Sequence, residues 1–339
     1  MKSRKIVFVE PGRVECVCEE FDGTLSSPTE VLVKNRYSLI SAGTELACLG
    51  GLESWFPLPR TPGYGAVGEA IAVGSGVAGV KKGDPVYTFG PHAEHFKADT
   101  VSDDFSLCVR IPDGLDAQQA VFTRMASIAM AGLRTSRIEL GDWVGVTGLG
   151  QVGNLAAQLA QLQGGRVIAL DVSEGRLRLA AACGIESPVR VDPKTVREKI
   201  MTQTDGAGLS TLIEATGRSA VVQECLPLMA RYGEVVLLGS PREPFETDLT
   251  DVLNYVHLIN RGCVELKGAH EWRYPTRPDP FVKHCIERNA KILFDLIAKG
   301  RLRVGPLCTH VLCPEDAAQA YEGLQKHPDD FVGVVFDWE

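Results

Sequence analysis

The sequence predicts an α/β protein in which a doubly wound parallel sheet accompanies a second domain of short β-strands. Three observations support this prediction: short alternating hydrophobic runs fill residues 1–118, strands alternate with amphipathic helices in residues 119–268, and a glycine triplet joins one of those strands to its helix. Residues 269–339 return to a mixed pattern and end in a helix followed by a strand. At 339 residues the chain exceeds the usual size of a single domain, so we expect two domains.

The first segment is predicted to be β-rich because its hydrophobic residues alternate over short runs. The runs "EVLVKNRYSLI" and "AVGEAIAVG" have the period of two that is typical of strands with one buried face. Turn signals such as Gly83-Asp84 and Pro112-Asp113-Gly114 separate the runs.

The second segment has the rhythm of a parallel sheet. Four apolar strands, "WVGVTG", "RVIALD", "LSTLIEATG" and "EVVLLGS", are separated by helices that we expect over 151–163, 173–183 and 219–230. No internal repeat or low-complexity stretch interrupts this order.

Composition excludes several classes of partner. The formal net charge of −8 offers no cationic surface for nucleic acid or for an anionic membrane. The amino-terminal apolar run is too short for a signal peptide, and no apolar stretch approaches the length of a membrane span. The ten cysteines are scattered without a C-x-x-C pair, which indicates buried thiols rather than disulfides. We therefore expect a soluble, cytoplasmic protein.

The stretch "VTGLGQVGNLAAQLAQLQGGRVIALD" carries a dinucleotide fingerprint. Three glycines form G-x-G-x-x-G between a strand and a helix, where they permit the tight turn, the approach of backbone to pyrophosphate, and close packing of helix on strand. The pyrophosphate then meets the positive end of the helix dipole. The predicted cofactor-binding residues are Gly148, Leu149, Gly150, Gln151, Val152, Gly153, Asp171, Arg176, Thr216 and Gly239.

Asp171 decides which dinucleotide is expected. It ends the second strand, where a carboxylate accepts hydrogen bonds from both ribose hydroxyls and repels a 2′-phosphate. Val172 and Ser173 follow it, and the first arginine is Arg176, so the sequence favours NAD over NADP.

At this point the chain resembles the medium-chain dehydrogenase/reductase superfamily, the zinc alcohol dehydrogenase group in particular, over nearly its whole length. The resemblance rests on "EVLVKNRYSLISAGTE", "TPGYGAVGEAIAVGSGVAGVKKGDPVY", "HAEHFKA", "IPDGLDAQQAVF", "ELGDWVGVTGLGQVG", "LIEATG" and "AAQAYEGL". It implies a GroES-like β-barrel domain over 1–118, a Rossmann domain over 119–268 and a return to the barrel domain over 269–339. It also implies a homodimer or homotetramer.

The chain departs from this family at the catalytic zinc. Where the family has a Cys in "CGTD", a His in "GHE" and a later Cys, Glu or Asp, this chain has "SAGTE", "GYG" and "FTRMAS". The ligand positions become Ala42, Tyr64 and Arg124, none of which is a normal zinc ligand. The four-cysteine structural lobe expected near residues 90–110 is reduced to Cys108. We therefore expect a member of the family without zinc.

Without zinc, another group must handle the proton of the alcohol. The position of Tyr64 makes it the leading candidate, with Arg124 as the cation that lowers the pKa of its phenol. The other interpretation is that Tyr64 and Arg124 only pack in the space that the zinc ion would occupy. The resemblance places Thr44 at the hydroxyl of a proton relay, although a local turn contact is also possible. It makes Glu45 a pocket residue that pairs with an arginine.

Two histidines and one tryptophan complete the candidates. We expect His92 and His95, in "PHAEHFKA", near the mouth of a cleft, with His92 as acid, base or substrate contact. Trp55 and the following "FPLPR" form an apolar loop that either lines the substrate pocket or packs on the barrel.

Three functions remain open from the sequence. The first is a zinc-independent, NAD-dependent oxidoreductase for a secondary alcohol, such as a polyol, a sugar or another cyclic alcohol. The pairing of "SAGTE" with "PGY" resembles the hydroxyethyl-bacteriochlorophyllide dehydrogenase branch, which implies a bulky cyclic substrate. The second is a zinc-free quinone or enone reductase, and the third is a dinucleotide-binding protein without catalysis. The substrate is in each case a small molecule.

Overall fold

The computed structural model describes residues 1–101 and 105–339, which form two compact units. Unit 1 comprises Met1–Arg124 and Tyr274–Glu339, and unit 2 comprises Met125–Arg273. Both boundaries fall a few residues after the predicted positions 118 and 268, the first of them inside helix α3 (Thr123–Thr135). Within the described residues, no helix has both the length and the apolar character needed to cross a membrane.

Unit 2 is built on a sheet of six parallel strands in the order β10-β9-β8-β11-β12-β13. In chain order the strands run third, second, first, fourth, fifth, sixth, which is the doubly wound order. The first strands of the two halves, β8 and β11, are neighbours, and the chain leaves them toward opposite edges of the sheet. The strands are β8 (Trp143–Thr147), β9 (Arg166–Asp171), β10 (Pro188–Arg190), β11 (Leu209–Glu214), β12 (Met229–Leu237) and β13 (Glu265–Gly268).

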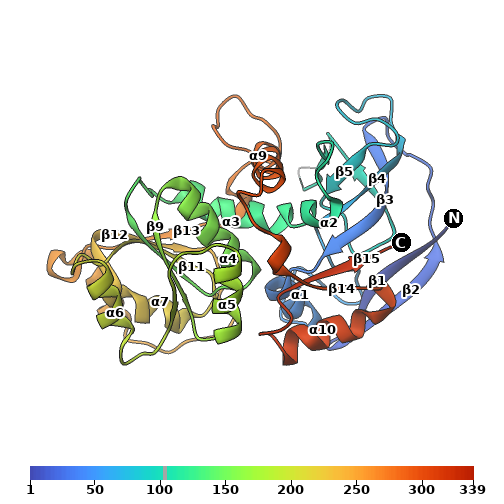
Figure 1. Cartoon of the computed structure of the whole chain (residues 1–339). Coiled ribbons are helices and arrows are strands. Elements are labelled where there is room, and N and C mark those ends of the chain that lie inside the picture. Colours follow the sequence, from blue (N-terminus) through green and yellow to red (C-terminus); the bar gives the residue numbers. More distant parts are fainter. Residues whose placement is uncertain (102–104) are drawn as a thin grey trace. The chain divides into compact units, whose positions relative to one another are not determined.

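Helices alternate with these strands, and Figure 1 shows them around the sheet. The central strands are apolar on both faces, as a covered parallel sheet requires, and Ile168, Leu212 and Val235 are fully buried in its core. The helices are α4 (Gln151–Gln163), α5 (Glu174–Ala182), α6 (Val196–Gln203), α7 (Ser219–Cys225) and α8 (Leu249–His257).

The helix predicted over 219–230 is shorter than expected. The α-helix α7 ends at Cys225, a single 3₁₀ turn covers Leu226–Leu228, and β12 begins at Met229. Pro227 explains the difference, because it lacks an N–H for the helical ladder and its ring crowds the preceding turn.

Unit 1 is the β-rich part and is assembled from both ends of the described chain. A sheet of seven strands follows the order β14-β15-β3-β4-β5-β7, with β6 also paired to β3, and β1 and β2 form a separate hairpin. β15 pairs antiparallel with β3, so the return segment completes the sheet. The strands are β1 (Lys2–Glu10), β2 (Arg13–Glu20), β3 (Glu30–Leu39), β4 (Ala66–Val73), β5 (Pro85–Thr88), β6 (His95–Asp99), β7 (Cys108–Arg110), β14 (Cys308–Leu312) and β15 (Gly333–Asp337).

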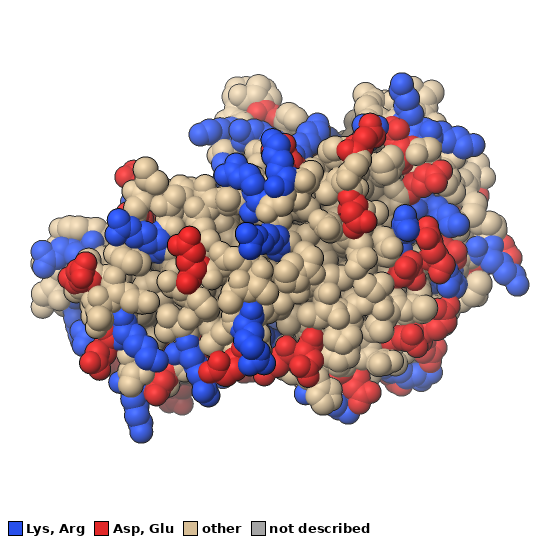
Figure 2. All heavy atoms as spheres, viewed as in Figure 1, with Lys and Arg blue, Asp and Glu red and all other residues tan. Residues whose placement is uncertain are grey.

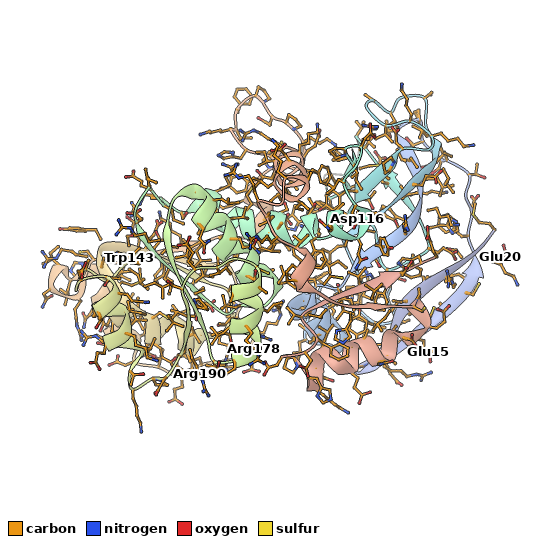
Figure 3. The ribbon with its side chains drawn as sticks, viewed as in Figure 1. Glu15, Glu20, Asp116, Trp143, Arg178 and Arg190 are labelled. Atoms are coloured by element: carbon orange, nitrogen blue, oxygen red, sulfur yellow. The ribbon has the colours of Figure 1, made fainter. Side chains whose placement is uncertain are left out.

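The helices of unit 1 close its main core. Phe8, Tyr321, Phe336 and Trp338 are buried together between strands and helices, and each such side chain contributes roughly 1.5–3 kcal/mol. Asp116 begins the shortest helix by accepting the N–H of Gln119 at 2.9 Å (Figure 3). The helices are α1 (Ala42–Leu49), α2 (Ala117–Ala120), α9 (Ile286–Ala298) and α10 (Ala317–Lys326).

The surface carries both signs of charge in close succession. On the face drawn in Figure 2, red and blue side chains alternate over the β1–β2 hairpin. Ion pairs join them, among them Lys5 with Glu19 at 2.5 Å. This hairpin therefore presents no field of a single sign.

Candidate functional site

A tight glycine turn joins β8 to α4. Gly148 has a φ of +85°, a backbone conformation that residues other than glycine rarely adopt. A Cβ on Gly153 would lie 1.7 Å from the Gly148 oxygen, so only glycine lets the helix approach the turn. A Cβ on Gly150, by contrast, would meet no atom within 4 Å. Contacts within the protein explain why glycine stands at positions 148 and 153 but not at position 150. The open space beside Gly150 fits the approach of a pyrophosphate to the backbone.

Asp171, at the end of β9, holds this turn in place through hydrogen bonds to backbone N–H groups. Its Oδ2 accepts the N–H of Leu149 at 2.6 Å, and its Oδ1 accepts the N–H of Ser173 at 2.9 Å. The Arg176 guanidinium lies 4.0 Å from Oδ2. A carboxylate oxygen has room for a second hydrogen bond, so bracing the turn is compatible with binding a ribose hydroxyl.

Glu214 performs a similar task at the end of β11, and the sequence analysis did not single it out. Its buried carboxylate accepts the N–H of Thr216 at 2.7 Å, the Thr216 hydroxyl, and the N–H of Gly217 at 3.2 Å. Its backbone oxygen accepts the N–H of Gly239 at 2.8 Å. The signal that identifies it is a lone carboxylate at the carboxyl end of a buried strand.

The remaining predicted cofactor residues lie around these loops. A Cβ on Gly148 would lie 2.7 Å from the Thr216 side chain, and one on Gly239 would lie 2.2 Å from the Gly217 nitrogen. Gln151 and Val152 form the first turn of α4. The loops that follow β8, β11 and β12 are thus in contact at the carboxyl edge of the sheet, where doubly wound folds bind their ligands.

A second cluster lies in unit 1, where Arg124 packs against Tyr64. The guanidinium carbon is 4.8 Å from the centre of the Tyr64 ring and 4.4 Å from that of Phe89. Its Nε donates to the Tyr64 backbone oxygen at 3.0 Å. A Cβ on Gly65 would lie 2.6 Å from Arg124 Cγ, so this glycine makes room for the arginine. The contact that the sequence suggested between Tyr64 and Arg124 is present.

The Tyr64 phenol is surrounded by hydroxyls. It donates a hydrogen bond to Ser41 Oγ, and the Thr44 side chain is also hydrogen-bonded to it. Burial raises the pKa of the phenol above 10.0; Arg124 lowers it, Glu45 raises it, and the two hydroxyls lower it. Arg124 lowers the pKa as expected, but burial outweighs the cation, so the net pKa is raised and the expectation of a lowered phenol pKa is wrong. Tyr64 is protonated at neutral pH.

Glu45 is buried beside these hydroxyls and is fixed by three donors. Its Oε1 accepts the Ser41 N–H at 2.7 Å, and its Oε2 accepts Tyr321 Oη at 2.5 Å. His92 Nε2 lies 2.9 Å from the same Oε2. The family resemblance implied an arginine partner for Glu45, whereas the ring of His92 lies beside it here.

His92 lies in the interior of unit 1 rather than at an opening. It is 0% exposed, its Nδ1 lies 2.8 Å from Ser38 Oγ, and Phe336 packs edge-on at 5.2 Å. Both ring nitrogens therefore have partners inside the protein, and no part of the ring is open to a substrate. The predicted position at the mouth of a cleft is wrong for this residue.

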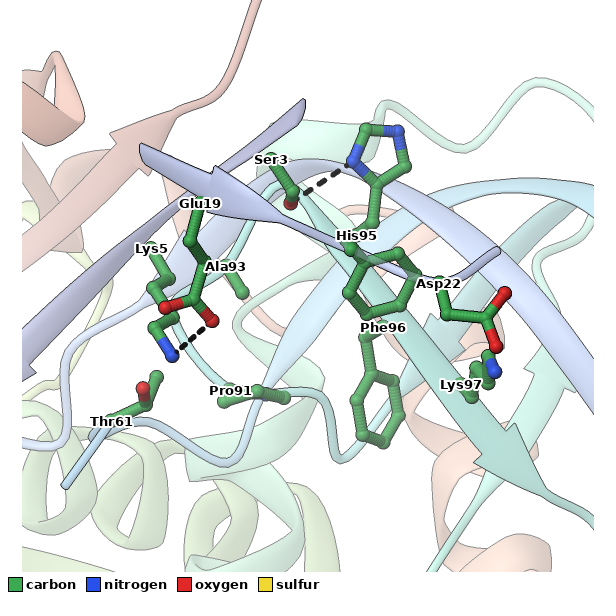
Figure 4. Close-up of a pocket in the computed structure, with 11 residues that line it drawn as sticks. Ser3, Lys5, Glu19, Asp22, Thr61, Pro91, Ala93, His95, Phe96 and Lys97 are labelled. Atoms are coloured by element: carbon green, nitrogen blue, oxygen red, sulfur yellow. Dashed lines mark hydrogen bonds and ion pairs between the residues drawn. The ribbon is translucent and has the colours of Figure 1, made fainter. Parts of the chain in front are cut away.

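His95 and Trp55, the other two predicted pocket residues, have partners outside the Tyr64 cluster. His95 lines a pocket of about 410 Å³ whose lining does not include Tyr64 (Figure 4). Its Nδ1 is 3.1 Å from Ser3 Oγ, and its ring stacks on Phe21. Burial lowers the pKa of His95, which leaves it neutral at pH 7. Trp55 is 56% exposed and donates to Glu53 at 2.8 Å.

The residues at the expected zinc positions do not fit the metal. The Ala42 side chain has no atom that can coordinate a metal, and the Tyr64 phenol keeps its proton. Arg124 places a buried positive charge beside Tyr64, where a zinc ion would be repelled. Cys108 is the single cysteine at the place of the expected four-cysteine lobe, and one thiol cannot hold a structural zinc ion alone. Among residues 1–101 and 105–339, no group of three or more His, Cys, Asp or Glu side chains is arranged to hold a metal ion.

Two family models match the chain. An alcohol dehydrogenase GroES-like domain matches residues 27–124, and a zinc-binding dehydrogenase domain matches residues 152–274. The D-guloside 3-dehydrogenase of Escherichia coli (strain K12) is 28% identical, and the alignment covers 98% of this chain and 100% of that protein.

Solved structures share the fold over nearly the whole chain. The galactitol-1-phosphate dehydrogenase of Escherichia coli superposes with a TM-score of 0.83 at 18% identity, covering 99% of this chain and 100% of that one. The quinone oxidoreductase of Pseudomonas syringae pv. Tomato DC3000 gives 0.81 at 21% identity, covering 99% and 100%.

Proposed function

Because the chain belongs to the medium-chain dehydrogenase/reductase superfamily of oxidoreductases, we propose that it transfers a hydride between a secondary alcohol and NAD without zinc. Its fold is a Rossmann unit combined with a GroES-like unit. Nicotinamide dinucleotides are bound in two solved structures of this fold, one with NADP and one with NADH. The observation that carries the proposal is the protonated Tyr64 beside a buried Arg124, at the positions where zinc ligands are expected.

NAD is the proposed dinucleotide because of Asp171. Its carboxylate, at the end of β9, disfavours a 2′-phosphate and can accept a ribose hydroxyl while it braces Leu149. Gly150 leaves open space at the start of α4 for the pyrophosphate. When bound, the nicotinamide accepts or supplies the hydride.

Tyr64 is the proposed acid and base. In its neutral form it donates a proton to the oxygen of a ketone, which neutralises the charge that develops there. In alcohol oxidation it must first lose its proton, and its raised pKa then favours oxidation at alkaline pH. Thr44 bonds the same phenol and is the proposed relay hydroxyl. Arg124 acts by limiting the rise of the Tyr64 pKa.

A polyol, a sugar or another cyclic alcohol is the proposed substrate class. The relatives named for guloside and galactitol-1-phosphate oxidation support it, since each of those substrates carries several secondary hydroxyls. The neutral Tyr64 would also suit protonation after hydride reduction of a conjugated C=C, which is the second candidate function. We further propose a cytoplasmic homo-oligomer that acts on small molecules.

The test compares two substrate panels and one variant. Purified protein is assayed with polyols and sugars plus NAD, and with quinones and enones plus NADPH. We expect turnover in the first panel. Tyr64→Phe keeps the ring against Arg124 and removes only the hydroxyl, so turnover should fall about 10²-fold or more while NAD affinity holds. Turnover confined to the second panel would select the enone reductase, and none in either panel would favour a binding protein.

A further inference from the structure

We propose that Glu45 is a positioning residue for Tyr64, held by His92 and Tyr321, which aligns the Ser41 hydroxyl with the phenol and keeps that phenol in its proton-donating form. This inference rests on the proposed role of Tyr64. In this inference a buried network favours ketone reduction over alcohol oxidation at neutral pH. The network consists of Ser41, Glu45, His92 and Tyr321.

The geometry fixes the carboxylate at both oxygens. Oε1 is held by the Ser41 N–H at 2.7 Å, and Oε2 is held by Tyr321 Oη at 2.5 Å and His92 Nε2 at 2.9 Å. Glu45 is 2% exposed, so water does not compete for these bonds. Charge-assisted hydrogen bonds of this kind are about twice as strong as neutral ones. The carboxylate therefore has little freedom to rotate.

The histidine in this network has a partner at each ring nitrogen. His92 Nδ1 lies 2.8 Å from Ser38 Oγ, which also accepts the Trp338 indole N–H at 2.9 Å. On the other side of the ring, Nε2 lies 2.9 Å from Glu45 Oε2. The ring is therefore fixed at both ends, and it limits the movement of the carboxylate.

The fixed carboxylate acts on Tyr64 in two ways. Through the Ser41 backbone it holds the residue whose Oγ accepts the Tyr64 proton, which sets the direction of the phenol O–H. Through its charge it opposes formation of a phenolate. Glu45 accordingly raises the Tyr64 pKa, after the larger effect of burial, whereas Arg124, Ser41 and Thr44 lower it.

The charged and titratable groups around the phenol come from several elements. Glu45 and Thr44 lie on α1, and Arg124 lies in the first turn of α3. Tyr321 lies on α10, and His92 precedes β6. The Tyr321 pKa is raised well above 10.0, first by burial and then by Glu45, so Tyr321 stays a donor over the pH range in which Tyr64 is tested. Arg124 and Glu45 thus act on the Tyr64 pKa in opposite directions. Removing Arg124 should raise this pKa, and removing the charge of Glu45 should lower it.

The experiment titrates Tyr64 directly in the full-length protein. The protein is labelled with ¹³C at the tyrosine ring Cζ, and the Tyr64 signal is assigned by its loss in Tyr64→Phe. Glu45→Gln keeps the size of the side chain and removes its charge, so the midpoint should move to lower pH. Ser41→Ala removes a hydroxyl that lowers the pKa and keeps the N–H on Glu45, so the midpoint should move to higher pH.

Controls and kinetics separate positioning from general destabilisation. Glu322→Gln removes an exposed carboxylate that pairs with Lys326 on α10, and it should leave the midpoint unchanged. In Glu45→Gln the alkaline limb of alcohol oxidation should move to lower pH together with the midpoint. The kcat for ketone reduction at pH 7 should fall about 10-fold to 100-fold with little change in KM.

The two hypotheses fail separately, because the titration needs no substrate. A folded Glu45→Gln protein with the wild-type midpoint overturns the role of Glu45, even if Tyr64→Phe abolishes turnover. Where Glu45→Gln does not fold, an unchanged midpoint in Ser41→Ala overturns it instead. Absence of all alcohol turnover in the wild type overturns the proposed function and leaves the titration result standing.

Discussion

The oxygen of Gly148 lies where a side chain on Gly153 would have to begin: the distance to an ideal Cβ is 1.7 Å. Gly150, between them in the sequence, has open space on the same criterion. Substitution by alanine should therefore destabilise the protein at Gly153 but not at Gly150. Gly153→Ala should lower stability by about 2–4 kcal/mol, as severe overpacking does, measured by urea unfolding.

Gly150→Ala should leave stability within about 0.5 kcal/mol, because its φ of −63° suits any residue and nothing crowds its Cβ. NAD affinity should instead fall, measured by fluorescence titration, since the new methyl group occupies the side open to the pyrophosphate. If Gly150→Ala binds NAD as tightly as the wild type, the pyrophosphate does not bind at Gly150.

Asp171→Asn should weaken NAD binding about 10-fold and NADP binding less. The amide keeps an oxygen for the Leu149 N–H at 2.6 Å but loses the charge that repels a 2′-phosphate. The measurement is the ratio of the two dissociation constants. A wild-type protein that already prefers NADP contradicts the assignment of Asp171.

Arg124→Met should move the alkaline limb of alcohol oxidation to higher pH. Oxidation needs the phenolate of Tyr64, Arg124 lowers the pKa of that phenol, and the methionine removes the cation 4.8 Å from the ring. The rate profile is measured between pH 7 and about 11, around the ordinary tyrosine pKa. Arg124→Lys, which retains a charge, should show a smaller displacement.

Arg4→Met should reduce stability at pH 7 by about 1 kcal/mol and have less effect near pH 3. Burial raises the Glu94 pKa, but the backbone N–H and guanidinium of Arg4 outweigh it, so the pKa lies below its ordinary value of 4.5. A lowered carboxylate pKa gives stability that is present above 4.5 and lost as pH falls through the folded value. Denaturant melts at the two pH values measure the difference, and an equal loss at both contradicts this account.

Chelation should leave both activity and the melting temperature unchanged, and elemental analysis should find no stoichiometric zinc. Ala42, Tyr64 and Arg124 supply neither thiolate nor imidazole at the expected ligand positions. About one zinc per chain that is lost together with activity would overturn the zinc-free assignment.

Local patterns predicted the strands and the glycine turn of unit 2 well, because these features are fixed by spacing along the chain. The roles of Gly148 and Gly153 follow from one turn, and Asp171 ends the next strand, only 22 residues after the backbone N–H that it binds. Glu214 was missed because a single carboxylate has no repeating pattern, although its position at a strand end is informative.

The network of unit 1 was less predictable because its partners are remote in sequence. Glu45 meets His92 across 47 residues and Tyr321 across 276 residues. No periodicity links such positions, so the sequence suggested an arginine partner for Glu45 and an open position for His92. The pKa of Tyr64 was also beyond reach, since the sequence shows the cation but not the burial that outweighs it.

The return of the chain to unit 1 has a consequence for its synthesis on the ribosome. Unit 2 is continuous, and all its residues exist once Arg273 has been made. At that moment Ser38 and Glu45 still lack Trp338 and Tyr321, and β3 lacks its neighbour β15. Closing loops of about 300 residues is slow, and an unpaired strand edge is prone to association in the meantime. The nascent chain therefore has all of unit 2 before it has all of unit 1, and the end of β3 around Leu39 lacks its β15 partner until residues 335–337 have been made.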